Sequence, residues 1–163
     1  MKTLLILRHA KSSWDNAYLA DHDRPLSGRG KADAPRMGRL VAQEGLTPQM
    51  IFSSSAERAL ATAEAVALAC GYEETVAVRR SLYHADPADY LEVLQSAPET
   101  AQCVMVVGHN PGLEELVEAL TGTAAQMPTG ALAQVELPVM AWREVNEETV
   151  GRLVQLWRPR DVA

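Results

Sequence analysis

The sequence has little cysteine: Cys70 and Cys103 are the only two in a chain of 163 residues. They stand far apart, form no C-x-x-C pair and show no spacing typical of metal ligands. We therefore expect two reduced core thiols in a cytoplasmic protein. The sequence predicts neither a disulfide nor a metal or other cofactor.

Positive charge is also scarce, because 15 lysines and arginines face 21 aspartates and glutamates, giving a formal net charge of -6. Proteins that bind a nucleic-acid backbone usually present a basic face. Here only the C-terminal tail, with Arg152, Arg158 and Arg160, is locally basic. This balance argues against a nucleic-acid partner. An acidic protein with a basic pocket would suit a small anionic substrate better.

Long hydrophobic runs are missing as well. The apolar start of the chain resembles a signal peptide, but it stops at Arg8 and no small-residue cleavage site follows. No segment approaches the length of a membrane span. There are also no repeats and no obvious linkers. We expect a cytoplasmic protein without a membrane partner, folded as one domain over residues 1–163.

The apolar patterning predicts an α/β fold. Residues 3–7 form an apolar run without polar alternation, which is typical of a strand buried on both faces of a parallel sheet. Further strands are expected over residues 50–53, 75–78 and 102–107, with helices over about 31–44, 54–70, 87–95 and 110–120. Residues 131–137 and 150–157 are expected to form an antiparallel pair. The sequence thus predicts a three-layer sandwich, a mostly parallel sheet flanked by helices with an antiparallel addition near the C-terminus.

Two helix starts carry specific signals. Ser54 is predicted to cap the second helix, with Glu57 completing a capping box. Asn110 is predicted to cap the last helix, with Pro111 as its first residue. Both starts follow buried strands, so their unpaired backbone N–H groups should face the same edge of the sheet.

Four cationic or imidazole side chains are expected at that edge. Arg8 and His9 end the first strand, His109 ends the strand over residues 102–107, and Arg58 lies in the first turn of the second helix. Ligand groups gather beyond the carboxyl ends of parallel strands. Guanidinium groups bind phosphate through paired hydrogen bonds. The sequence therefore predicts a site for a phosphate group.

These motifs, in this order, resemble the histidine phosphatase superfamily, which contains the phosphoglycerate mutases. The resemblance rests on Leu7–Ala10, followed by Ser12 and Trp14, then Arg58 after two serines, and Gly108-His109. Within that superfamily, residues 21–27 and 127–131 are similar to the compact SixA-type phosphohistidine phosphatases. The sequence departs from the superfamily pattern at four positions, Ala10, Lys11, Asp15 and Ser55.

The resemblance implies a metal-independent phosphatase in which His9 attacks phosphorus and forms a phosphohistidine intermediate. Arg8, Arg58 and His109 would stabilise the transferred group. Ser12, Arg24 and Asn110 are expected to bind the phosphate or the rest of the substrate.

The sequence leaves open which residue, if any, acts as the general acid. Asp86 is the first candidate, with a helix-capping role as the alternative, and Asp15 and Asp21 come next. Asp21 is more easily read as a partner of Arg24. Trp14 is expected in the core, and His22 and His84 at the surface.

Three functions fit the sequence. The preferred one is removal of phosphate from a phosphohistidine in a partner protein of the phosphorelay type. The second is hydrolysis of a small phosphorylated metabolite, a phosphomonoester. The third is a phosphate-binding module without catalysis, which the presence of both His9 and His109 disfavours. The sequence does not predict an oligomeric state.

Overall fold

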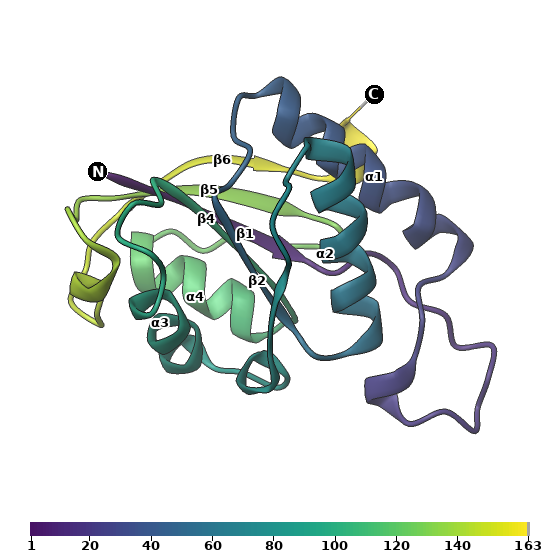
Figure 1. Cartoon of the computed structure of the whole chain (residues 1–163). Coiled ribbons are helices and arrows are strands. Elements are labelled where there is room, and N and C mark those ends of the chain that lie inside the picture. The colour runs from purple at the N-terminus through teal and green to yellow at the C-terminus, as the bar shows by residue number, and fades with distance from the viewer. Residues whose placement is uncertain (163) are drawn as a thin grey trace.

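A mixed six-stranded sheet lies at the centre of the computed structural model, which describes residues 1–162 (Figure 1). The strands stand in the order β3-β2-β4-β1-β5-β6. β1 pairs in parallel with β4, and β2 in parallel with β4 and β3, whereas β5 and β6 add antiparallel strands beyond β1. The strands are β1 (Lys2–Arg8), β2 (Met50–Ser54), β3 (Ala77–Arg79), β4 (Cys103–Gly108), β5 (Leu132–Leu137) and β6 (Arg152–Trp157). This arrangement confirms the predicted fold class.

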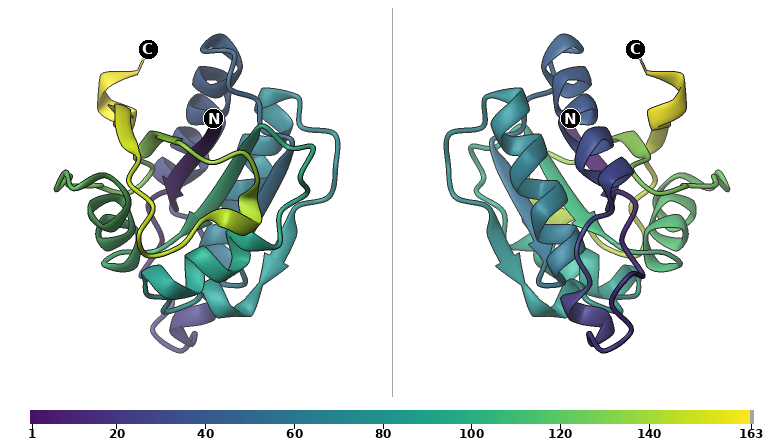
Figure 2. Two further views of the ribbon diagram at one scale, coloured as in Figure 1. Left: turned by 90° about the vertical axis from the view of Figure 1, so that its left-hand side faces the viewer. Right: turned by 90° about the vertical axis from the view of Figure 1, so that its right-hand side faces the viewer.

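Helices cover both faces of the sheet (Figures 1 and 2). The helices are α1 (Gly28–Gln43), α2 (Glu57–Cys70), α3 (Pro87–Gln95) and α4 (Gly112–Thr121). Side chains alternate along a strand, so β1 supplies Leu5 and Leu7 to the layer of α1 and α2, and Leu4 and Ile6 to the layer of α3 and α4. All four side chains are fully buried, which explains the uninterrupted apolar run of β1.

Short 3-10 turns complete the chain. They are η1 (Asp21–Asp23), η2 (Arg80–Leu82), η3 (Trp142–Glu144) and η4 (Pro159–Asp161). η1 belongs to the loop between β1 and α1, which projects from the body of the molecule in both views of Figure 2. No helix among residues 1–162 is long and apolar enough to cross a membrane.

The register brings three strand ends to one edge. Arg8 pairs with Gly108, and Ser53 pairs with Val107. β1, β2 and β4 therefore end side by side, and the segments that follow them start from a common edge of the sheet. This is the edge at which the sequence predicts a phosphate site.

Several element boundaries differ from the prediction. α1 begins at Gly28 rather than near residue 31, because the Ser27 hydroxyl accepts the N–H of Gly30 and caps the helix. β3 is shorter and starts two residues later than predicted. Gly45 and Gly71 follow α1 and α2 in the left-handed conformation, with φ of 69° and 81°, as expected for helix-ending glycines.

Both predicted helix caps at the strand ends are wrong. Ser54 is the last residue of β2, and α2 begins only at Glu57, with Ala56 as its cap residue. α4 begins at Gly112, and the Asn110 side chain donates to the carbonyl of Met127 instead of capping the helix. Ser54 still belongs to the strand and its hydroxyl contacts His109, while the Asn110 amide contacts Met127, so neither residue is the cap of the helix that follows.

Candidate active site

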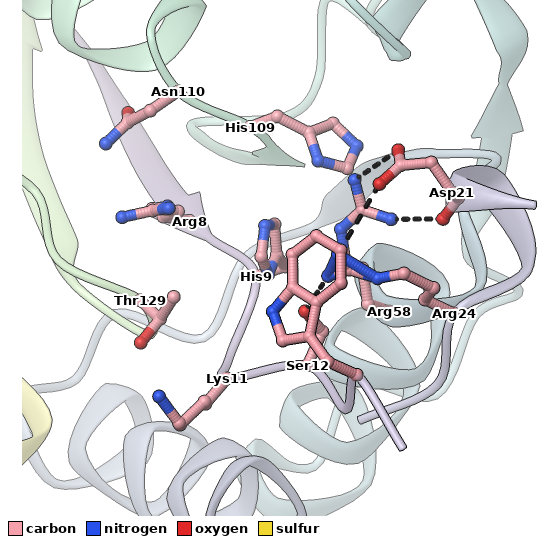
Figure 3. A pocket seen from close by; sticks show the side chains of 11 residues that line it. Arg8, His9, Lys11, Ser12, Asp21, Arg24, Arg58, His109, Asn110 and Thr129 are labelled. Carbon is pink, nitrogen blue, oxygen red and sulfur yellow. Dashed lines mark hydrogen bonds and ion pairs between the residues drawn. The ribbon is translucent and has the colours of Figure 1, made fainter. Parts of the chain in front are cut away.

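A cavity of about 300 Å³ opens where β1, β2 and β4 end (Figure 3). It brings together the predicted residues Arg8, His9, Ser12, Arg24, Arg58, His109 and Asn110. Lys11, Trp14, Asp21 and Thr129 also line it. Four of these side chains are lysine or arginine, and Asp21 is the one carboxylate among the described lining residues. The cavity therefore favours an anion even though the whole chain is acidic.

His9 lies at the centre of the lining and is 6% exposed. Its Nδ1 is 2.7 Å from the carbonyl oxygen of Ala10. A carbonyl only accepts hydrogen bonds, so Nδ1 carries the proton and Nε2 keeps its lone pair. Burial, together with the charges of Arg58, Arg8 and Arg24, lowers the pKa of His9 to about 4. The imidazole is thus neutral and nucleophilic near neutral pH.

His109 stands beside His9, with 5.1 Å between the ring centroids. Its Nε2 is 2.8 Å from the hydroxyl of Ser54, which accepts the backbone N–H of Ala56. The hydroxyl proton of Ser54 is then free to bond to Nε2, which places the His109 proton on Nδ1. That nitrogen is buried without a protein partner. Burial and the neighbouring His9 lower the pKa of His109 to about 3.

Arg58 is held by the loop that follows β1. One of its terminal nitrogens donates to the backbone carbonyl of Asp21 at 2.7 Å, and the other to the Asp21 carboxylate at 3.0 Å. Tyr83 also donates to that carboxylate, at 2.6 Å. These hydrogen bonds, from Tyr83 first and then from Arg58, lower the pKa of Asp21 to about 2. Asp21 is therefore ionised and serves as an anchor for Arg58 (Figure 3).

The predicted pairing of Asp21 with Arg24 is confirmed, with 3.5 Å between the charged groups. Arg24 also donates to the Ser12 hydroxyl and lies 3.4 Å from the centroid of the Trp14 ring. Trp14 is 75% exposed, so its predicted place in the core is wrong. It lines the pocket because its ring stacks on the guanidinium of Arg24.

Arg8 and Asn110 lie on the opposite side of His9 from Asp21 and Arg24 (Figure 3). Both donate to the carbonyl oxygen of Met127, at 3.0 and 2.8 Å. Arg8 Nε and Asn110 Oδ1 are buried without a hydrogen-bond partner. The two residues line the cavity with part of their hydrogen-bonding capacity unused by the protein.

The remaining predictions have mixed outcomes. Asp86 caps α3, where it forms a capping box with Asp89, and it does not line the cavity. Asp15 is exposed and also lies outside the lining. His84 is exposed, as predicted, and His22 is half-buried against Ser55. Ala10, one of the four departures from the superfamily pattern, has no positive φ, so its side chain causes no backbone strain.

Sequence reasoning missed Lys11, Thr129 and Tyr83. Lys11 and Thr129 adjoin motifs that the sequence analysis singled out, so proximity to those motifs was the available signal. Tyr83 had no such signal, because its contact with Asp21 joins residues 62 positions apart. No group of three or more His, Cys, Asp or Glu side chains among residues 1–162 is placed to hold a metal ion.

Comparison with known families agrees with this geometry. The model of the histidine phosphatase superfamily, branch 1, matches residues 4–86. The chain belongs to this superfamily. The match spans β1, α1, β2 and α2, and so includes Arg8, His9 and Arg58.

Individual proteins extend the likeness over almost the whole chain. An uncharacterised chloroplastic protein of Arabidopsis thaliana is 35% identical over 88% of this chain and 70% of its own length. A protein of Agrobacterium tumefaciens, provisionally named a phosphohistidine phosphatase SixA, has a crystal structure with a TM-score of 0.82 and 28% identity, covering 97% and 98% of the two chains.

The protein histidine phosphatase SixA in complex with tungstate has a TM-score of 0.83 at 24% identity, with 97% of each chain covered. These neighbours place the present superfamily member in the phosphoglycerate mutase-like fold.

Proposed function

We propose that this protein is a metal-independent phosphatase that removes phosphate from phosphohistidine in a partner protein, through a phosphohistidine intermediate on His9. His9 Nε2 attacks phosphorus while the bond from phosphorus to the substrate imidazole breaks. The electron pair stays on the leaving imidazole nitrogen, which takes a proton from solvent. Water then attacks the phosphorus on His9, releasing phosphate and the free enzyme.

The charges of the pocket suit this transfer. The transferred group bears its charge on three oxygens, and fixed donors stabilise it best. Arg58, the free Nε of Arg8 and the unpaired Nδ1–H of His109 can all donate to it. Four cationic side chains supply the neutralisation for which other phosphatases use a metal ion.

The choice between the two classes of substrate depends on the leaving group. An alkoxide needs a proton from an acid, and acid catalysis typically contributes about 10²- to 10⁴-fold. Asp21 is the one carboxyl group among the described lining residues, and its pKa of about 2 keeps it ionised. Asp86 caps a helix elsewhere. An imidazole leaves without strong acid assistance, so the site is better suited to a P–N bond than to a phosphomonoester.

The rim of the pocket supports a protein substrate. Trp14 lines the cavity and is 75% exposed, and Tyr18 in the same loop is fully exposed. Tryptophan and tyrosine are enriched in the contact surfaces of protein complexes. The structural neighbour from Agrobacterium tumefaciens is also provisionally named a phosphohistidine phosphatase.

The test is a comparison of turnover on a phosphohistidine peptide and on O-phosphoserine, a small phosphomonoester whose alkoxide leaving group needs a proton. The proposal predicts a kcat/KM about 10²- to 10⁴-fold higher on the peptide, by the size of the missing acid catalysis. Equal or better turnover of the ester would instead assign the site to small phosphomonoesters. Loss of both activities in His9→Ala, but not in His84→Asn at the surface, would locate both in this pocket.

A further inference from the structure

A second cavity, of about 400 Å³, adjoins the active site on its Arg8 side. Arg8 and Asn110 line both cavities, so they form the wall between them. The other lining residues of the second cavity are Glu114, Gln126, Met127, Pro128, Arg158 and Arg160. A group bound at His9 could therefore extend past Arg8 and Asn110, the two wall residues labelled in Figure 3, into the second cavity.

The fold holds the C-terminal arginines at this place. Gly130 donates its N–H to the carbonyl of His9 at 2.9 Å, which fixes the loop 127–131 to the end of β1. Pro159 packs directly on Gly130, where an added Cβ would lie 2.7 Å from the proline ring. Arg158 and Arg160 flank Pro159, so the proline contact keeps both beside the catalytic strand end.

The side chains that line the second cavity carry a net positive charge. Among its described lining residues, three arginines stand against one carboxylate, Glu114. Glu114 is already bound to the backbone N–H of Met127, at 2.7 Å. Within residues 1–162, Arg158 has no hydrogen-bonded or ionic partner for its side chain, and Arg160 has only the weak 3.9 Å contact with Asp161. Unpaired cations gathered at a cavity of an acidic protein call for an anionic ligand.

We infer that this cavity is a second anion site, which binds an acidic side chain of the substrate protein next to the phosphohistidine. The inference rests on the proposed function. Arg8 and Asn110 form the shared wall and would contact the substrate chain between the two anions. The site would make the enzyme select phosphohistidines that have a glutamate or aspartate nearby.

The experiment compares two phosphohistidine peptides of equal length, one with flanking glutamates and one with glutamines at the same positions. Phosphoramidate, which has no flanks, reports on the catalytic centre alone. The protein is the full chain, with the double variant Arg158→Gln/Arg160→Gln. The matched control is Arg143→Gln/Arg152→Gln, which removes the same charge from exposed arginines that line neither cavity.

The wild type should prefer the acidic peptide by roughly five- to twenty-fold in kcat/KM, through KM, as two rim charges would give. The Arg158/Arg160 variant should lose that preference and keep its phosphoramidate turnover, whereas the control variant keeps both. A wild type without preference, or a preference that survives in the Arg158/Arg160 variant, would overturn the inference while leaving the phosphatase proposal intact. Absence of turnover on all three substrates would instead overturn the proposed function.

A second arm separates a side-chain carboxylate from a second phosphate. Inhibition by pyrophosphate is measured against inhibition by phosphate in the same variants. If the Arg158/Arg160 variant loses affinity for pyrophosphate only, and treats the two peptides as the wild type does, the site is one for a second phosphate and the acidic side chain is rejected as its occupant.

Discussion

His9 and His109 owe their chemical state to where the sheet places them. Both follow the last residue of a buried strand, so both are removed from water and have strongly lowered pKa values, about 4 and about 3. The carbonyl of Ala10 fixes the tautomer of His9, and Ser54 orients His109. A neutral nucleophile and an unpaired donor thus follow from burial and two local hydrogen bonds.

These residues could be predicted because their positions depend only on where strands and helices end. Arg8 ends β1, Arg58 lies in the first turn of α2, and His9 and His109 directly follow β1 and β4. The role of Asp21 could not be predicted in full. Its contacts with Arg58 and Tyr83 depend on the path of a long loop, which no periodic pattern in the sequence encodes.

The Asp21 carboxylate is bonded to Arg58 inside the cavity, so we expect it to compete with a bound phosphate for that guanidinium. Replacement by asparagine removes the one carboxylate of the described lining, so phosphate should bind more tightly, by about three- to tenfold. The inhibition constant of inorganic phosphate against phosphohistidine-peptide turnover measures this. Asp23→Asn is the matched control, because Asp23 lies on the same turn and outside the cavity. Equal or weaker phosphate inhibition in Asp21→Asn would contradict this reading of the carboxylate.

At the scale of elements, the strands and the helix-ending glycines follow from apolar runs and from backbone freedom. The starts of α2 and α4 do not follow from such local patterns. The side chain of Ser54 is hydrogen-bonded to His109, and that of Asn110 to the carbonyl of Met127. A tertiary partner alone does not prevent capping. The Ser27 hydroxyl donates to the carbonyl of Lys11, and it still accepts the N–H of Gly30 and caps its helix.

The start of α1 packs through Gly30 against the loop that follows β1. A Cβ on Gly30 would lie 2.1 Å from the carbonyl oxygen of Lys11, two residues after His9. Gly30→Ala should therefore displace this loop, destabilise the protein by about 1–3 kcal/mol and lower kcat. Gly28→Ala is the matched control on the same helix, since nothing lies within 4 Å of its added Cβ, and its effect should stay within about 0.5 kcal/mol.

Urea unfolding and steady-state kinetics of the two alanine variants measure these effects. If Gly30→Ala proved as stable and as active as Gly28→Ala, the close approach of α1 to the Lys11 carbonyl would not hold the loop in place.

At the scale of the whole molecule, the buried histidines connect the site to folding stability. Unfolded histidines titrate near pH 6.5, whereas His9 and His109 stay neutral in the fold down to about pH 4 and 3. Between these values the unfolded chain binds more protons. The contribution of these two histidines to the free energy of unfolding is therefore fully present above about pH 6.5. It falls as the pH drops toward their pKa values in the folded protein.

Urea unfolding at pH 7.0 and 4.5 should show this loss, on the order of a few kcal/mol for the two histidines together. The loss should be smaller in His9→Gln, which removes one of the two groups. His84→Asn is the control, since it replaces an exposed histidine and should keep the wild-type pH dependence. If the free energy of unfolding fell between pH 7.0 and 4.5 by the same amount in His9→Gln as in the wild type, His9 would not be held neutral by the fold.

The molecule as a whole combines a net charge of -6 with two adjoining cavities that are rich in arginine. The basic cavities favour an anionic group even though the molecule as a whole is acidic. The family and the fold could both be predicted from the sequence, because strand ends carry the diagnostic residues. The second cavity could not, since Arg158 reaches the site only through the packing of Pro159 on Gly130.

The most direct test of the account is acid-quench trapping of the enzyme during turnover of a phosphohistidine peptide labelled on phosphorus. The wild type and His84→Asn should each acquire label in an acid-labile, base-stable adduct, and His9→Ala should acquire none. Release of labelled phosphate without any adduct, or an adduct that persists in His9→Ala, would contradict the assignment of His9 as the nucleophile.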